Sequence, residues 1–208
     1  MNEILYLKCK RKNYNPHHVC EVGVYYPETS NILGFIYEGI KTTLVEPLPE
    51  CIELINMYFS DHHNVKLFPF AVADEGGPIE LFMHESSSFA TTLESSPALK
   101  NDNFSKEHGI RITVSAKRFD KIDDGTIELI SIDVEGSEWF VLKHMVSRPD
   151  VISLELKSKH YRNPFTREIN GWLSANNYIK WFDDRSDSVF IKNGVFELTY
   201  FEKLKNFI

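Results

Sequence analysis

Ile127-Glu128-Leu129-Ile130-Ser131-Ile132-Asp133-Val134-Glu135-Gly136 is the stretch that decides the fold. Its apolar density over residues 127–134 predicts a buried strand, and the periodicity of residues 137–146 predicts a helix directly after it. A strand followed at once by a helix is half of a β-α-β unit, in which helices connect parallel strands. The stretch therefore indicates an α/β chain whose strand ends in acidic residues.

The same alternation of strands and helices extends along the whole chain. Strands are predicted at 19–23, 41–45, 65–73, 79–83, 127–134, 151–156, 178–182 and 188–191, with an edge or insertion strand at 111–115, and helices at 29–40, from Pro47 and Pro49 onward, 137–146 and 166–175. Such spacing implies right-handed crossovers and a mostly parallel sheet with helices on both faces. The last two strands are too close for a crossover helix, so one of them must be antiparallel. We therefore expect a Rossmann-like, mostly parallel seven-stranded sheet with one antiparallel strand near the C-terminus.

Length and composition favour a single domain over residues 1–208. The 208 residues are 42% hydrophobic, which is enough for one substantial core. We expect an N-terminal cap segment at 1–17 and a polar insertion or lid at 84–110, because connections this long usually serve a purpose.

Charge and hydropathy set expectations about location and partners. The formal net charge of -7 disfavours nucleic acid as a partner. The sequence offers neither an apolar run of bilayer length nor the pattern of a signal peptide, so we expect no membrane insertion and a cytoplasmic location. The oligomeric state is left open.

Acidic residues follow three of the predicted strands. Glu21, Glu46 and Asp133, the last with Glu135 beside it, stand at strand ends. Ligands of open parallel sheets bind beyond the carboxyl ends of the strands. An acid there can also simply satisfy a helix dipole, but three at matching places favour a ligand site.

The spacing of the first two strand ends suits a nucleoside. Glu46 lies 23 positions after Gly23, where a carboxylate can accept hydrogen bonds from both hydroxyls of an adenosine ribose. Gly23 allows close approach of the backbone to a ligand. A complete G-x-G-x-x-G motif is missing, which makes a nicotinamide-dependent oxidoreductase the weaker alternative.

An ordered set of motifs resembles the FkbM methyltransferase family between about residues 19 and 156. The most specific piece is Ile132-Asp133-Val134-Glu135-Gly136-Ser137-Glu138, followed by Val141-Leu142-Lys143. Supporting pieces are Val45-Glu46-Pro47, Ala71-Val72-Ala73-Asp74, residues 86–93 and Ser153-Leu154-Glu155-Leu156. The resemblance implies a class I methyltransferase fold, S-adenosylmethionine as cofactor, and O-methylation of sugars or related natural products.

The resemblance also implies where the cofactor would bind. Glu21 and Gly23 would flank its methionine part, Glu46 followed by Pro47 would hold the ribose, and Ala71-Val72 would border the adenine. Asp133 would lie nearest the reacting methyl group.

The first motif departs from the family pattern. Tyr25 and Pro27 stand where the family tends to have an asparagine and a second glycine. Thr29 and Ser30 still offer hydroxyl and N–H groups at the next helix start, so Tyr25 and Thr29 are kept in the expected cofactor site. The departure leaves a non-enzymatic interaction module with a degenerate cofactor site as an alternative.

O-methylation requires a way to remove the proton of the acceptor hydroxyl, by a base or by a metal ion. Asp133 and Glu135 would project to the same side if the strand continued to residue 135. Glu155 ends the following strand, and Lys157 and His160 just beyond it would complete an acceptor rim, with His160 the general base favoured by residue type and an ordinary surface histidine as the alternative. Asp133 and Glu135 are also the candidate ligands of a divalent metal, although no diagnostic ligand spacing is present.

The serine-rich stretch at residues 86–92 suggests the acceptor. Its many hydroxyl groups suit a polyhydroxylated partner, so we expect a sugar or glycan, with a non-sugar natural product as the alternative. A flexible solvated insertion is the other interpretation of this stretch. The chain could also be part of a larger sugar-modifying polypeptide.

Overall fold

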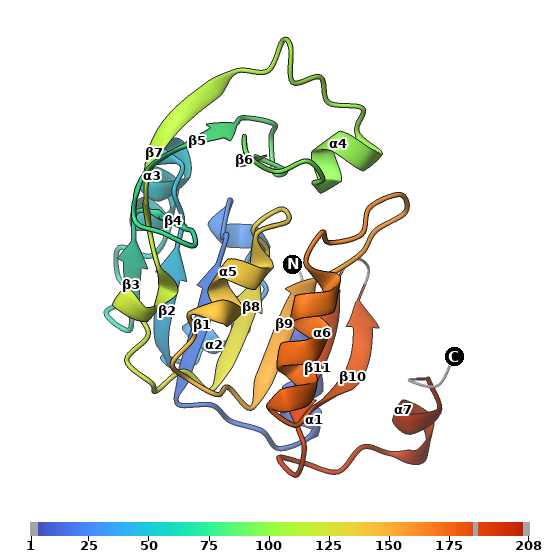
Figure 1. Ribbon diagram of the computed structural model, residues 1–208. Helices are drawn as coiled ribbons and strands as arrows, with labels where there is room; N and C mark the ends of the chain where they lie inside the picture. Colours follow the sequence, from blue (N-terminus) through green and yellow to red (C-terminus); the bar gives the residue numbers. More distant parts are fainter. Residues whose placement is uncertain (1–3, 185–186, 206–208) are drawn as a thin grey trace.

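A computed structural model describes residues 4–184 and 187–205. Within these ranges the centre is a seven-stranded sheet of order β10-β11-β9-β8-β1-β2-β3 (Figure 1). Its strands are β1 (His18–Val22), β2 (Lys41–Val45), β3 (Val65–Phe68), β8 (Leu129–Ile132), β9 (Val151–Glu155), β10 (Tyr178–Asp184) and β11 (Asp187–Lys192). β11 pairs antiparallel with β9 and β10, whereas the other pairs in this described sheet are parallel. The predicted Rossmann-like, mostly parallel sheet is confirmed.

Helices cover both faces of this sheet. On one face lie α5 (Glu138–Lys143) and α6 (Thr166–Ala175), and on the other lie α1 (Ile4–Arg11), α2 (Leu33–Tyr37) and α3 (Pro49–Tyr58) (Figure 1). Successive side chains of a strand point to opposite faces. Leu129 of β8 accordingly joins the core against α1 and α2, whereas Ile130 joins the core against α5 and α6. The apolar run of β8 is therefore buried in both directions.

A second sheet, four-stranded in the described ranges, was not predicted. It contains β4 (Ala71–Val72), β5 (Gly77–Phe82), β6 (Phe89–Ala90) and β7 (Arg111–Lys117) in the order β4-β7-β5-β6. The single strand predicted at 65–73 is divided at Pro69, because proline has no N–H group for the hydrogen-bond ladder. β3 stays in the main sheet and β4 pairs with β7, so β7 is an interior strand of the added sheet.

The serine-rich insertion packs against the rest of the protein. It contains β6 and α4 (Pro97–Asn101), and its Phe89 and Phe104 rings contact each other and Phe82 with centroids 5.4–5.5 Å apart. Figure 1 shows β6 and α4 above the carboxyl ends of the central strands. The segment is thus held over the expected ligand-binding edge by its own aromatic cluster.

Two predicted helices are shorter than expected. The helix predicted at 29–40 is replaced by a 3-10 turn, η1 (Pro27–Thr29), and by α2, which begins at Leu33. The Ser30 hydroxyl donates to Glu21 Oε2 at 2.5 Å and the Asn31 N–H donates to Glu21 Oε1 at 2.8 Å, which holds this segment out of the helix. The helix predicted at 137–146 is α5, whereas α6 has the bounds predicted for it.

The ends of the chain add small elements. Residues 4–11 of the expected N-terminal cap form α1, whose Leu5 and Cys9 are buried. Residues 1–3 of that cap, and residues 185–186 between the last two strands, lie outside the described residues. Short helices η2 (Phe119–Lys121) and α7 (Tyr200–Lys205) complete the described elements. In the part of the chain that is described, no helix combines the length and apolar character needed to cross a bilayer.

Gly23 gives a test of how closely the loops after β1 and β8 approach each other. Gly23 has φ +84°, and a Cβ atom there would overlap the Asp133 carbonyl oxygen. We expect Gly23→Ala to lower the free energy of unfolding by about 2 to 5 kcal/mol, measured by urea denaturation, because strain and overlap add. Gly39→Ala is the control, since Gly39 has φ +78° with nothing within 4 Å, and should cost about 1 to 2 kcal/mol. Equal losses in the two variants would contradict the close approach.

Candidate active site

A cavity of about 920 Å³ lies at the carboxyl ends of the central strands. Small-molecule sites typically range from about 300 to 1,000 Å³, so this cavity is large enough for more than one group. Glu21, Glu46 and Asp133 all line it, together with residues of β5 and of the segment 85–92. The three strand-end acids predicted from the sequence are therefore brought to one place.

Backbone hydrogen bonds hold the loop after β1. Glu46 Oε2 accepts the N–H groups of Val24 and Tyr25 at 3.1 and 2.9 Å, and Glu46 Oε1 accepts the N–H of Leu48 at 3.0 Å. Burial raises the pKa of Glu46, while these donors act in the opposite direction. Because Oε1 accepts one N–H, it keeps a lone pair for a ligand hydroxyl.

The departure from the family pattern leaves this loop in place. Tyr25 has φ +56°, a left-handed conformation that glycine adopts more readily. Its N–H bond to Glu46 holds the loop in that conformation. Tyr25 lines the cavity and its ring lies 4.0 Å from that of Tyr26.

The other predicted cofactor residues also line the cavity. They are Gly23, Thr29, Pro47, Ala71 and Val72. The Thr29 hydroxyl donates to the Tyr26 carbonyl at 2.8 Å, so it closes the turn of η1. The carboxylate of Glu21 is engaged by Ser30 and Asn31, and burial raises the pKa of Glu21 to about 7.

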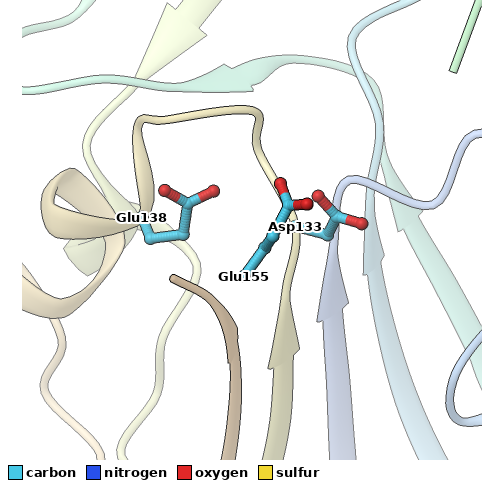
Figure 2. Close-up of side chains that lie close together, drawn as sticks. All are labelled: Asp133, Glu138 and Glu155. Atoms are coloured by element: carbon cyan, nitrogen blue, oxygen red, sulfur yellow. The ribbon is translucent and has the colours of Figure 1, made fainter. Parts of the chain in front are cut away.

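Three carboxylates from separate elements lie close together at the cavity, and two of them, Asp133 and Glu155, line it. Asp133 follows β8, Glu138 begins α5 and Glu155 ends β9 (Figure 2). In the described chain, one oxygen of each lies within 4.8 Å of the others. Burial and the charge of Glu155 raise the pKa of Asp133 well above its ordinary value.

Glu138 was missed as a site residue, although it stands in the quoted motif as its second glutamate. Its Oε1 accepts the N–H groups of Val134 and Gly136 at 3.0 and 3.2 Å, and its Oε2 accepts from Asn163 Nδ2. Burial raises the pKa of Glu138 to about 7, although the backbone donors lower it. Glu138 therefore holds the turn between β8 and α5.

Glu135 reaches the cavity by another route than the one predicted. β8 ends at Ile132 and Glu135 has φ +55°, so the assumption that strand alternation continues to residue 135 is wrong. Glu135 nevertheless lines the cavity, and its Oε2 is buried without a hydrogen-bond partner among the described residues. Burial and the charge of Asp133 raise its pKa.

The structure does not bring Lys157 or His160 to the cavity. β9 ends at Glu155, and Lys157 forms an isolated bridge with Arg162 as the chain turns away. Lys157 Nζ lies 3.6 Å from Asp183 Oδ2, and the exposed His160 donates its backbone N–H to Asn101 Oδ1 at 3.1 Å. Of the acceptor rim expected from this segment, Glu155 alone lines the described cavity.

Tyr161 is a buried neighbour of these acids, and sequence reasoning did not find it. Its side chain is fully buried, and its hydroxyl has no hydrogen-bond partner in the described ranges. Burial and the charges of Glu138 and Glu155 raise its pKa. Tyr161 follows the polar residues 157–160, which show no helical or strand periodicity, so no spacing rule predicts that its side chain is buried.

The charge of the cavity is one-sided. Among the described residues that line it, nine carry carboxylates and none is lysine, arginine or histidine. Such a lining favours cationic or uncharged ligands and repels phosphates.

The fold is shared with solved methyltransferase structures. A candidate caffeoyl-CoA O-methyltransferase of Staphylococcus aureus aligns with a TM-score of 0.53 and 11% identity, over 92% of this chain and 82% of that one. A candidate RNA methyltransferase of Pyrococcus horikoshii aligns with a TM-score of 0.50 and 11% identity, over 92% and 82%. At this identity the alignments show a shared fold.

The family follows from the sequence itself. A profile described as "Methyltransferase FkbM domain" matches residues 21–180, well over half of the chain. The protein belongs to the FkbM methyltransferase family. A search of curated proteins found no match.

Glu21 makes stability depend on pH in a testable direction. Its carboxyl has an ordinary pKa of 4.5 and a folded pKa of about 7, so between these values the unfolded chain loses a proton that the folded chain keeps. This term lowers the free energy of unfolding as pH rises from about 4.5 to 7, by roughly 3 kcal/mol at about 1.4 kcal/mol per unit. We expect Glu21→Gln to lose that part of the pH slope in urea titrations with chelator present. The exposed Glu53→Gln should keep the parental slope, and a parental slope in Glu21→Gln would refute the assignment.

Proposed function

We propose that this FkbM-family methyltransferase methylates a hydroxyl group of an uncharged sugar or glycan. The observation that carries the proposal is the pairing of Asp133, Glu135 and Glu155 with the hydroxyl-bearing segment 86–92 across one cavity. Carboxylates can accept the proton of an alcohol, and serine and threonine hydroxyls can pair with several sugar hydroxyls.

The first half of the cavity fits the cofactor of this class. S-adenosylmethionine would supply a methyl group carried on a positively charged sulfur, together with the leaving group. Glu46 offers a lone pair to the ribose, Gly23 presents backbone alone to the cavity, and Ala71-Val72 offers an apolar wall. The excess of carboxylates complements the positive charge.

The second half of the cavity fits the acceptor. Asp133 Oδ1 and Glu135 Oε2 are buried and have no hydrogen-bond partner among the described residues. A hydroxyl placed between them and the cofactor half would donate its hydrogen bond to a carboxylate, which increases the nucleophilicity of its oxygen. Holding the two reactants in line then supplies much of the rate enhancement.

The charge of the lining supports an uncharged acceptor over a phosphorylated one. Phosphate groups would face several carboxylates and no described cationic side chain of the cavity wall. A non-sugar natural product with free hydroxyls is the second candidate acceptor, because serine and threonine pair equally with any alcohol. A cytoplasmic location and membership of a larger sugar-modifying polypeptide belong to the same proposal.

The alternative, a non-enzymatic module, is suggested by Tyr25 and Pro27, which depart from the family pattern in the first motif. Calorimetry with the demethylated cofactor separates it from the proposed function. We expect saturable binding to the parent and a loss of affinity of about 10- to 100-fold in Glu46→Gln, the usual size for a hydrogen bond to a charged group. Glu50→Gln on the exposed face of α3 is the matched control and should bind like the parent. Absence of binding to the parent at millimolar ligand would favour the non-enzymatic module.

Asp133 gives a test of catalysis apart from binding. In a screen of sugars for uptake of radiolabelled methyl groups, we expect Asp133→Asn to lower turnover by at least about 100-fold, as for general acid–base groups. Its affinity for the demethylated cofactor should change less than about threefold. Equal turnover in parent and variant would remove Asp133 from the catalytic role, and uptake into phosphorylated sugars alone would refute the uncharged acceptor.

A further inference from the structure

We propose that Asp133, Glu138 and Glu155 bind a divalent cation of the oxygen-loving kind, such as Mg²⁺, Mn²⁺ or Ca²⁺, in the acceptor half of the cavity. Binding of the ion is independent of the proposed function, whereas its role in the reaction rests on that function. The site is assigned from side chains of three elements that the fold brings to one point (Figure 2).

The spacing of the carboxylate oxygens fits such an ion. One oxygen of each side chain lies within 4.8 Å of the others. Oxygens on opposite sides of a bound ion are separated by about twice the metal–oxygen distance, roughly 4 Å for Mg²⁺ and 5 Å for Ca²⁺. Three protein oxygens would leave positions for water and for an acceptor hydroxyl.

A fourth acid gives an independent sign that this place suits a cation. Glu135 is 8% exposed, and its Oε2 has no hydrogen-bond partner in the described ranges. Besides burial, the neighbouring charges of Asp133, Glu155 and Glu138 raise the pKa of Glu135, whereas a side-chain hydrogen bond with Ser87 lowers it, so its carboxylate lies near the cluster. A buried carboxylate oxygen without a hydrogen-bond partner is costly, and a bound cation offsets that cost.

The described lining of the cavity carries an excess of negative charge. Lysine, arginine and histidine are missing from the described lining of the cavity, and Lys157, the nearest basic residue along the chain, lies against Asp183. Water can satisfy a lone pair, but it leaves the repulsion between neighbouring carboxylates in place. A divalent ion removes this repulsion and uses the oxygens as ligands.

Glu138 would be the positioning member of the set. It already accepts N–H groups from Val134 and Gly136, which fixes the turn that presents Asp133. Partners that orient metal ligands in this way commonly change affinity by 10- to 100-fold. We therefore expect Asp133 and Glu155 to contact the ion more directly than Glu138 does.

The ion would act on the acceptor. A hydroxyl bound to a divalent cation loses its proton more easily, and a carboxylate such as Glu135 can take that proton. The hydroxyl oxygen then forms its bond to the methyl carbon as the carbon–sulfur bond breaks, and the electron pair of that bond stays on sulfur.

Metal binding can be measured without any activity. Chelator-treated protein is titrated with Mn²⁺ and free Mn²⁺ is followed by electron paramagnetic resonance. We expect one saturable site in the parent, and at least about tenfold weaker binding in Asp133→Asn and in Glu155→Gln. Glu53→Gln on the exposed face of α3 should match the parent, and Mg²⁺ or Ca²⁺ should compete.

Thermal unfolding gives a second readout that a folding defect would not imitate. In chelator, Asp133→Asn should be at least as stable as the parent, because it removes a buried charge. Added Mn²⁺ should raise the midpoint of the parent and not that of the variant, since a ligand stabilises only the state that binds it.

The outcomes separate this inference from the proposed function. Absence of saturable Mn²⁺ binding at low-millimolar concentration, or parental binding by both Asp133→Asn and Glu155→Gln, overturns the metal site. If the demethylated cofactor still binds in that case, the proposed function stands without the ion. If Mn²⁺ binds and the demethylated cofactor does not, the metal site stands and the proposed function is refuted.

Discussion

Repulsion between carboxylates at one edge of a parallel sheet is the constraint on which the site depends. Parallel strands deliver their carboxyl ends to the same edge, so Glu21, Glu46, Asp133 and Glu155 are forced together. Backbone N–H groups that donate to Glu46 and Glu138 offset part of this repulsion. What is left beside Asp133 and Glu155 is negative charge, which attracts cations and repels phosphates.

The sheet was predictable because its signals are local. The apolar run of β8, the proline-initiated α3 and the short connection before β11 each act within a few residues. Together they indicate a mostly parallel sheet with one antiparallel strand near the C-terminus. The strand-end acids follow from the same logic, since the edge of a parallel sheet is known once the strands are known. Glu21, Glu46 and Asp133 could therefore be placed in one cavity before any coordinates.

Elements that depend on contacts distant in sequence could not be placed. Pro69 divides one apolar run between two sheets, and the partner of its second part, β7, lies some forty residues later. His160 was favoured by residue type, yet its position is decided by a bridge between Lys157 and Arg162 that no spacing rule predicts. Glu135 reached the cavity through a left-handed backbone turn instead of strand alternation.

The hydrogen bonds that Glu46 accepts from the loop after β1 have a consequence for the sequence of that loop. The backbone N–H groups of Val24 and Tyr25 donate these bonds, so a side chain outside the loop stabilises the conformation of the loop. The conformation of the loop therefore does not require the glycine pattern. A sequence search that demands glycines at this turn would miss this chain, whereas a search for the acid after the second strand would find it.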